Sequence, residues 1–125
     1  MNPHKTENLL KLPAEERVAY FVRKVADFEK VWGLESEGWA TAKTNDGQLV
    51  IPFWPEKELA ELCAVSEWKG YVPSEIALSI FMQKWLSGME ADQILPAIFP
   101  TPNDKGTLIE PKQLKEMLVS ECDQY

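Results

Sequence analysis

The sequence contains one histidine, His4, and only two cysteines, Cys63 and Cys122. A Ser–His or Cys–His catalytic relay needs a histidine on the folded body, and His4 lies in a polar N-terminal segment, which argues against serine and thiol hydrolases. One histidine and two distant cysteines also cannot supply the three or four ligands of a structural zinc site. We expect both cysteines to be reduced thiols without the basic neighbours that would make them nucleophilic.

Glycine motifs, basic clusters and long apolar runs are also missing. The six glycines are scattered, and neither a G-x-G-x-x-G nor a G-x-x-x-x-G-K motif occurs, so we expect no nucleotide cofactor. With 13 Lys and Arg against 20 Asp and Glu, the formal net charge of −7 argues against nucleic acid and anionic membrane as partners. No apolar run approaches the roughly 18 residues that cross a bilayer, and residues 1–11 lack the apolar core of a signal peptide. We expect a cytoplasmic protein that binds no cofactor and no metal.

The chain has the proportions of one globular domain. It has 125 residues, of which 45% are hydrophobic and 26% charged, and a chain of this length buries enough surface to form one core without disulfides. We expect a single α+β domain over residues 12–120. A flexible N-terminal arm over 1–11 and a loose C-terminal tail over 121–125 flank it in this interpretation.

The residue patterns predict a mainly antiparallel sheet with about four helices packed on it. Apolar residues at helical spacing from Val18 to Phe28 predict a helix over 12–30. From Val31 the period changes to two, and Asp46-Gly47 suits a tight hairpin turn better than a calcium loop, so strands at 31–34, 38–43 and 48–54 form a predicted antiparallel meander. The later predicted elements are a short helix over 55–65, an edge strand over 71–76, a helix from Leu78 that ends at Gly88, a strand over 94–99, an extended piece over 107–109 and a last helix from Pro111.

Five tryptophans are unusual in a chain of this length, and we expect most of them to lie in the core. Two aromatic–proline turns, Trp54-Pro55 and Phe99-Pro100, differ from the other aromatic positions because each stands at the end of a predicted strand. If these turns lie side by side and are exposed, they form an apolar ledge that could anchor a partner protein. The simpler alternative is that both turns pack in the core. The candidate binding residues are Trp54, Pro55, Phe99, Pro100, Trp68 and Tyr71.

Two carboxylates are candidates for acid–base chemistry. Glu35 and Glu37 flank a predicted turn between Trp32 and Trp39, and an apolar neighbour can raise a carboxyl pKa toward catalytic values. The alternative is that both side chains are solvated on a turn.

Several motifs together resemble a small bacterial family of unknown function, DUF2750, over about Ala14 to Leu118. The motifs are Val31-Trp32-Gly33-Leu34, Gly38-Trp39-Ala40, Ile51-Pro52-Phe53-Trp54-Pro55, Ala60-Glu61-Leu62-Cys63-Ala64, Glu67-Trp68 and Phe99-Pro100-Thr101-Pro102 with Gly106. That family brings no assigned activity with it. The second half of the chain also loosely resembles the SseB-type domain, and bacterial domains of that general sort include some thought to act as antitoxin or immunity partners.

Two functions from different classes therefore remain open. The first is a non-catalytic, acidic protein-binding module of an immunity-like or regulator-like kind, whose partner is another protein. The second is a small enzyme or ligand-binding protein that uses a carboxylate in a tryptophan-lined pocket. A homodimer is compatible with either function.

Overall fold

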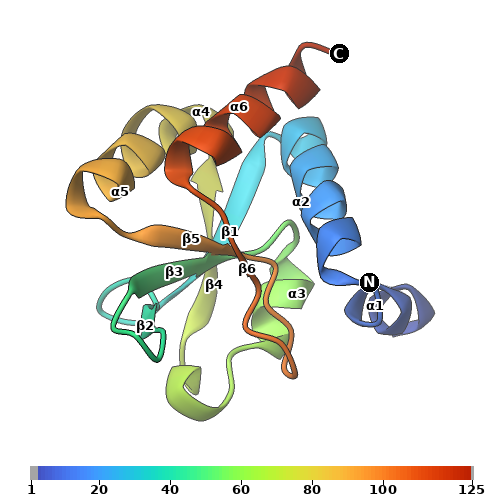
Figure 1. The fold of residues 1–125 in the computed structure, drawn as a ribbon. Helices are drawn as coiled ribbons and strands as arrows, with labels where there is room; N and C mark the ends of the chain where they lie inside the picture. Colours follow the sequence, from blue (N-terminus) through green and yellow to red (C-terminus); the bar gives the residue numbers. More distant parts are fainter. Residues whose placement is uncertain (1–2, 125) are drawn as a thin grey trace.

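A four-stranded mixed sheet lies at the centre of the protein (Figure 1). In the computed structural model, which describes residues 3–124, its order is β2-β3-β5-β6. The parallel pair β3–β5 occupies the middle, and β2 and β6 are antiparallel to their neighbours. The strands are β2 (Ala42–Lys43), β3 (Leu49–Phe53), β5 (Leu95–Ile98) and β6 (Thr107–Leu108).

Strand β1 (Lys30–Glu35) pairs with β4 (Val72–Ala77) in a separate antiparallel ribbon. Two main-chain hydrogen bonds between Trp32 and Trp54, of 2.9 and 2.8 Å, join this ribbon to the end of β3. The predicted three-stranded meander is formed only in part. The β2–β3 hairpin with its turn at Gly47 is confirmed, and an antiparallel bridge between Glu35 and Trp39 joins the end of β1 to the next predicted strand, but the main pairing partner of β1 is β4. Alternating apolar residues show that a strand is half buried, but they do not specify which strand pairs with it.

The outer edge of β4 is protected against further strand pairing. The N–H and C=O groups of Trp32 bond to Trp54 and therefore point away from β4. Because Glu75 lies opposite Trp32 in the ribbon, its own main-chain groups point to the outer edge of β4, and those of Pro73 do the same. Pro73 has no N–H to donate and Glu75 is charged, and both properties discourage edge-to-edge association. The predicted edge strand over 71–76 is confirmed.

Helices surround the two sheets. The helical elements are α1 (Pro3–Leu10), α2 (Ala14–Phe28), α3 (Lys57–Leu62), the 3₁₀ turn η1 (Ser66–Trp68), α4 (Leu78–Ile80), the π-helical η2 (Phe81–Trp85), α5 (Leu86–Asp92) and α6 (Pro111–Cys122). No helix among residues 3–124 is both long and apolar enough to span a membrane.

Elements α4, η2 and α5 form one helical run that continues past the predicted stop at Gly88. The run ends at Asp92, where Gln93 adopts the left-handed conformation (φ 59°) and caps the helix. Gly88 lies inside α5 with no atom near its missing side chain, so it can remain helical. Within η2, the Leu86 N–H bonds to the Phe81 carbonyl, five residues back.

The chain termini are more regular than the sequence pattern predicted. Most of the predicted arm over 1–11 is helix α1, with Leu9 buried and Lys5 paired with Glu56 at 3.5 Å. At the other end, α6 continues to Cys122 inside the predicted loose tail. The parts of these expectations that concern Met1, Asn2 and Tyr125 lie outside the described residues.

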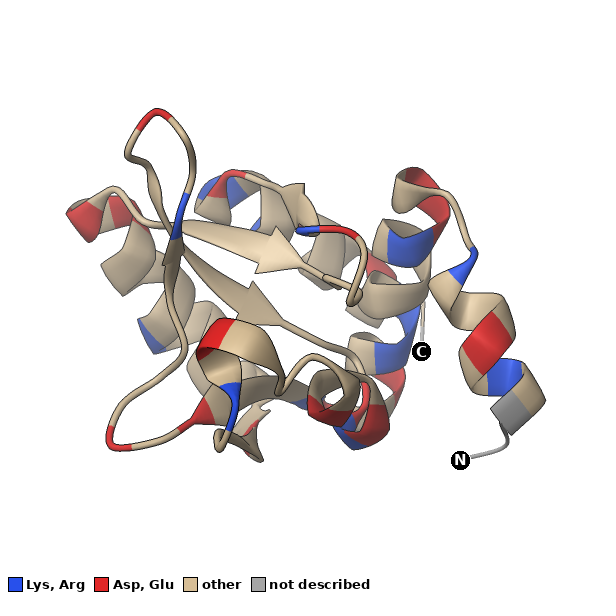
Figure 2. Cartoon of the chain, turned by 90° about the horizontal axis from the view of Figure 1, so that it is seen from below, with Lys and Arg blue, Asp and Glu red and all other residues tan. Residues whose placement is uncertain are grey.

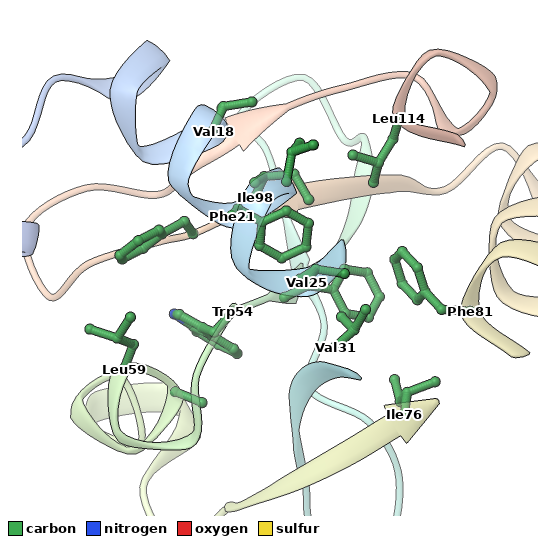
Figure 3. Close-up of a cluster of buried hydrophobic side chains, with 14 of the residues drawn as sticks. Val18, Phe21, Val25, Val31, Trp54, Leu59, Ile76, Phe81, Ile98 and Leu114 are labelled. Atoms are coloured by element: carbon green, nitrogen blue, oxygen red, sulfur yellow. The ribbon is translucent and has the colours of Figure 1, made fainter. Parts of the chain in front are cut away.

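The main core lies between the larger sheet and helices α2 and α6 (Figure 3). Phe21 and Val25 of α2, Ile98 of β5 and Leu114 of α6 are all fully buried there. These residues confirm the apolar stripe predicted for the first helix, although Phe28 at its end is 55% exposed.

We predict that Gly33→Ala destabilises the fold. A Cβ at this position would lie 2.9 Å from Cζ3 of Trp39, whose ring is held edge-on against Trp85 at 4.8 Å, so the new methyl overpacks the site. The expected loss in the free energy of unfolding is about 1–3 kcal/mol, measured by urea denaturation. Gly88→Ala is the matched control, because its Cβ enters open space in a helix and should raise stability by about 0.5–1 kcal/mol. Equal effects of the two substitutions would contradict the packing argument.

Candidate functional site

A cavity of about 610 Å³ lies on the face of the larger sheet that is opposite the α2–α6 core. Strand register places small apolar side chains from all four strands on this face, and they form the floor: Ala42, Val50, Pro52, Ala97 and Leu108. The central strands β3 and β5 carry no charged residue (Figure 2). We call this cavity the sheet pocket. Its volume is typical of protein sites that hold ligands or anchor side chains.

Trp68 forms an aromatic wall of the sheet pocket and remains partly exposed. Its indole N–H donates to the Thr41 carbonyl at 3.2 Å. Its ring meets Trp54 edge-on, with centroids 6.1 Å apart and an interplanar angle of 89°. Trp68 is therefore held in one orientation while part of its surface is left for contact with another molecule.

The loop between β5 and β6 forms another wall of the sheet pocket. The Pro100 carbonyl accepts hydrogen bonds from Trp54 Nε1 (2.9 Å) and Cys63 Sγ (3.4 Å). Phe99 is fully buried in the left-handed conformation (φ 53°), and a Cβ on Gly106 would lie 3.0 Å from the Ile98 carbonyl. A non-glycine residue in the left-handed conformation costs energy and persists only where surrounding contacts hold it. Such residues cluster at binding and active sites.

The predicted aromatic–proline ledge is not exposed. The two turns do lie side by side, as the Trp54–Pro100 hydrogen bond shows, but Trp54 and Phe99 are both 0% exposed and Pro55 and Pro100 are buried. Burial is tolerated because the indole N–H of Trp54 has an acceptor and the ring of Phe99 packs against Tyr20 at 6.1 Å. Pro100 lines the sheet pocket. Trp54, Pro55 and Phe99 do not line it, but Trp54 holds Pro100 in place through their hydrogen bond.

Of the remaining predicted site residues, one lines the sheet pocket and three do not. Trp68 lines the sheet pocket, whereas Tyr71 is half buried against the core and does not line it. Glu35 is half buried in β1, and Glu37 is exposed in a left-handed turn. Neither carboxylate lines the sheet pocket, nor the cavities between α2 and α6 and between α5 and α6, so the structure gives no support to a catalytic pocket beside Trp32 and Trp39.

Sequence patterns missed a buried cation beside this site. Arg17 is only 4% exposed, although a charged residue of an amphipathic helix usually lies on its solvent-facing side. Its Nη1 donates to the Leu12 carbonyl at 2.8 Å, and Nη2 lies 3.1 Å from Oδ2 of Asp104 in the pocket loop. That ion pair lacks hydrogen-bond geometry, so Nε and Nη2 have no hydrogen-bond acceptor among the described residues.

Two titratable groups of the sheet pocket, Cys63 and Asp104, have shifted pKa values. Burial raises the pKa of the Cys63 thiol to about 11. The Gly106 N–H, which donates to Oδ1 of Asp104 at 2.8 Å, and the Arg17 guanidinium lower the pKa of Asp104. Cys63 is therefore a neutral thiol and Asp104 a carboxylate. No group of three or more His, Cys, Asp or Glu side chains suited to a metal ion occurs within residues 3–124.

We predict that thiol reagents distinguish the two cysteines. The pKa of both thiols is raised, so exposure decides which one reacts first at pH 8: Cys63 is buried, and a disulfide reagent such as DTNB should modify the half-buried Cys122 before it. Titration in denaturant should then release both thiols. Rapid modification of both cysteines in the native protein would contradict the burial and pKa of Cys63.

We also predict a pH-dependent contribution from Asp104. Because its folded pKa is lowered, its charge stabilises the native state at neutral pH, and this contribution is lost as pH falls through the folded pKa. Asp104→Asn should cost on the order of 1 kcal/mol at pH 7, since its side chain is 46% exposed, and the difference from the wild type should shrink in acid. Urea denaturation across pH measures this difference. Asn103→Ala, at an exposed neighbouring position without a titratable side chain, is the control, and its difference from the wild type should not change with pH.

A family model described as "Protein of unknown function (DUF2750)" matches residues 18–118. The matched span includes both sheets and every residue of the sheet pocket. Neither the curated proteins nor the solved structures contain a match to the chain. The resemblance to SseB-type domains therefore stays a prediction.

Proposed function

Because the chain belongs to the DUF2750 family, whose description assigns no activity, we propose a function from the structure itself. The protein is a non-catalytic binding module that holds a partner protein through the sheet pocket. The observation that carries this proposal is the partly exposed ring of Trp68 over an apolar floor. Aromatic side chains in such pockets are the commonest energetic anchors of protein interfaces.

The chemistry of the pocket favours binding over catalysis. Cys63 is protonated and Asp104 is ionised near neutral pH, so neither is poised to exchange a proton there. Nucleophilic catalysis by Cys63 would need a thiolate, and the raised pKa opposes its formation.

The surroundings of the pocket favour a protein over a small molecule. Two exposed apolar side chains line it, Val65 (49% exposed) and Leu108 (41% exposed), and the exposed loop residues Asn103 and Lys105 add polar groups. A polar rim around an apolar centre is the usual anatomy of a protein interface. The net charge of −7 favours a basic partner, because complementary charge accelerates encounter.

A small ligand is the second candidate. The pocket volume suits one, and Glu67 lies next to Trp68 in the lining, so a carboxylate in a tryptophan-lined pocket is present here in place of Glu35 and Glu37. A homodimer stays a further prediction, although the protected outer edge of β4 gives it no pairing surface there.

We predict that Trp68→Ala abolishes partner binding. The immobilised protein is exposed to native host lysate, and the retained proteins are quantified by mass spectrometry. Val65→Glu is a second test variant, because this residue is exposed and its replacement should leave folding intact. Phe28→Ala is the matched control: it removes an exposed aromatic ring that does not line the pocket, and it should retain the partner.

The results separate the two candidate functions. A saturable partner that both pocket variants lose and the control retains supports a protein-binding module. If no protein depends on Trp68 while native mass spectrometry finds a small molecule displaced by Trp68→Ala, the pocket is a ligand site instead. Circular dichroism confirms that each variant is folded.

A further inference from the structure

A second groove, about 1020 Å³ in volume, runs between α2 and α6 and lies outside the proposed function. We propose that this helix groove docks a basic amphipathic helix of a partner protein. The proposal rests on the shape of its two walls and on the charge that lines them.

One wall of the helix groove is a row of side chains on α2, and the other is a row of side chains on α6. Residues Ala14, Val18 and Val22 follow one face of α2, where Val18 and Val22 are largely buried against the core, and Gln113, Met117 and Ser120 follow one face of α6. Both rows recur every three or four residues and extend about 12 Å, or roughly two helical turns. Small side chains, including the exposed Ala19, leave space between the helices. A short helix with apolar residues at the same spacing fits such a groove.

Every charged residue that lines the helix groove is acidic. These residues are Glu15 at the start of α2 and Glu116 and Glu121 on α6. None of the three belongs to an ion pair found among residues 3–124. The groove therefore concentrates negative charge that a cationic partner would neutralise.

The cations of α2 and the two lysines of α6 face elsewhere, so the acidic lining is a property of the groove itself. On α2, Arg17 is buried against Asp104, Arg23 lies 5.5 Å from the Tyr20 ring centroid, and Lys24 lies 5.5 Å from that of Phe28. On α6, Lys112 and Lys115 line a different cavity, between α5 and α6, which Glu116 borders as well.

A helix fits the helix groove better than an added strand. The edge strand β6 borders it, but the register of β5 and β6 turns the main chain of only one residue of β6, Leu108, outward. One residue gives too few hydrogen bonds to hold an extended peptide. Leu108 also lines the sheet pocket, so it is not used in the test.

The test compares two synthetic peptides of identical leucine and lysine composition. One places leucine at helical spacing over about three turns, and the other alternates leucine with lysine as in a strand. Fluorescence anisotropy measures affinity, and amide chemical shifts of the labelled full-length protein locate the contact. We expect the helical pattern to bind at least tenfold tighter, with shifts along 14–22 and 113–121.

Matched variants separate the helix groove from general charge attraction. The groove variant combines Glu15→Gln, Glu116→Gln and Glu121→Gln, and the control combines Glu37→Gln, Glu58→Gln and Glu61→Gln, which are exposed and outside the groove. Both variants have the same net charge. The groove variant should weaken binding at least tenfold more than the control. Ala19→Arg, at an exposed helical position, should block binding by filling the groove.

Four outcomes would overturn the proposal. They are absence of saturable binding, equal or tighter binding of the strand-patterned peptide, equal weakening by the two triple variants, and shifts centred on the sheet pocket. Failure of the Trp68→Ala test leaves this inference unaffected, because Trp68 does not line the helix groove.

Discussion

The carbonyl oxygen of Pro100 is the junction on which the candidate site depends. It accepts hydrogen bonds from Trp54 at the end of β3 and from Cys63 at the end of α3, so one buried acceptor joins two strands, a helix and a loop. A buried carbonyl without donors would be costly, and a buried indole N–H without an acceptor equally so. Because each satisfies the other, Phe99 can hold its left-handed conformation and the loop that it starts can wall the sheet pocket.

Local structure was largely predictable from the sequence, whereas strand pairing was not. The apolar stripe from Val18 to Val25 and the turn at Gly47 depend on neighbours a few residues away, and both were predicted correctly. The pairing of β1 with β4 joins segments about forty residues apart, and β-periodicity contains no information about that partner. The burial of Arg17 was not predictable for a related reason: its counterion, Asp104, lies in a distant loop, so the burial depends on a contact that helical spacing cannot show.

The candidate site was only partly predictable because no single segment builds it. Trp68 and Pro100 were recognised as aromatic and proline turn residues, but the floor beneath them combines alternate side chains of four strands. Trp54 and Phe99 were expected to be possible surface anchors because their sequence context is that of a turn. Both residues directly follow their strands, and the parallel pairing of β3 with β5 brings the two strand ends together. Trp54 and Phe99 are therefore buried side by side.

The π-helical segment allows both halves of one helical run to face the core. Phe81 and Leu86 are 0% and 2% exposed, yet they are five residues apart and would lie about 140° apart around a regular α-helix. The hydrogen bond from the Leu86 N–H to the Phe81 carbonyl widens this turn and brings both side chains to the same face. The helix has thus absorbed one extra residue without changing which way either half faces. Removing one residue between these two positions would leave them four residues apart in a regular α-helix, on the same face, so α5 with Met89 would still face the core.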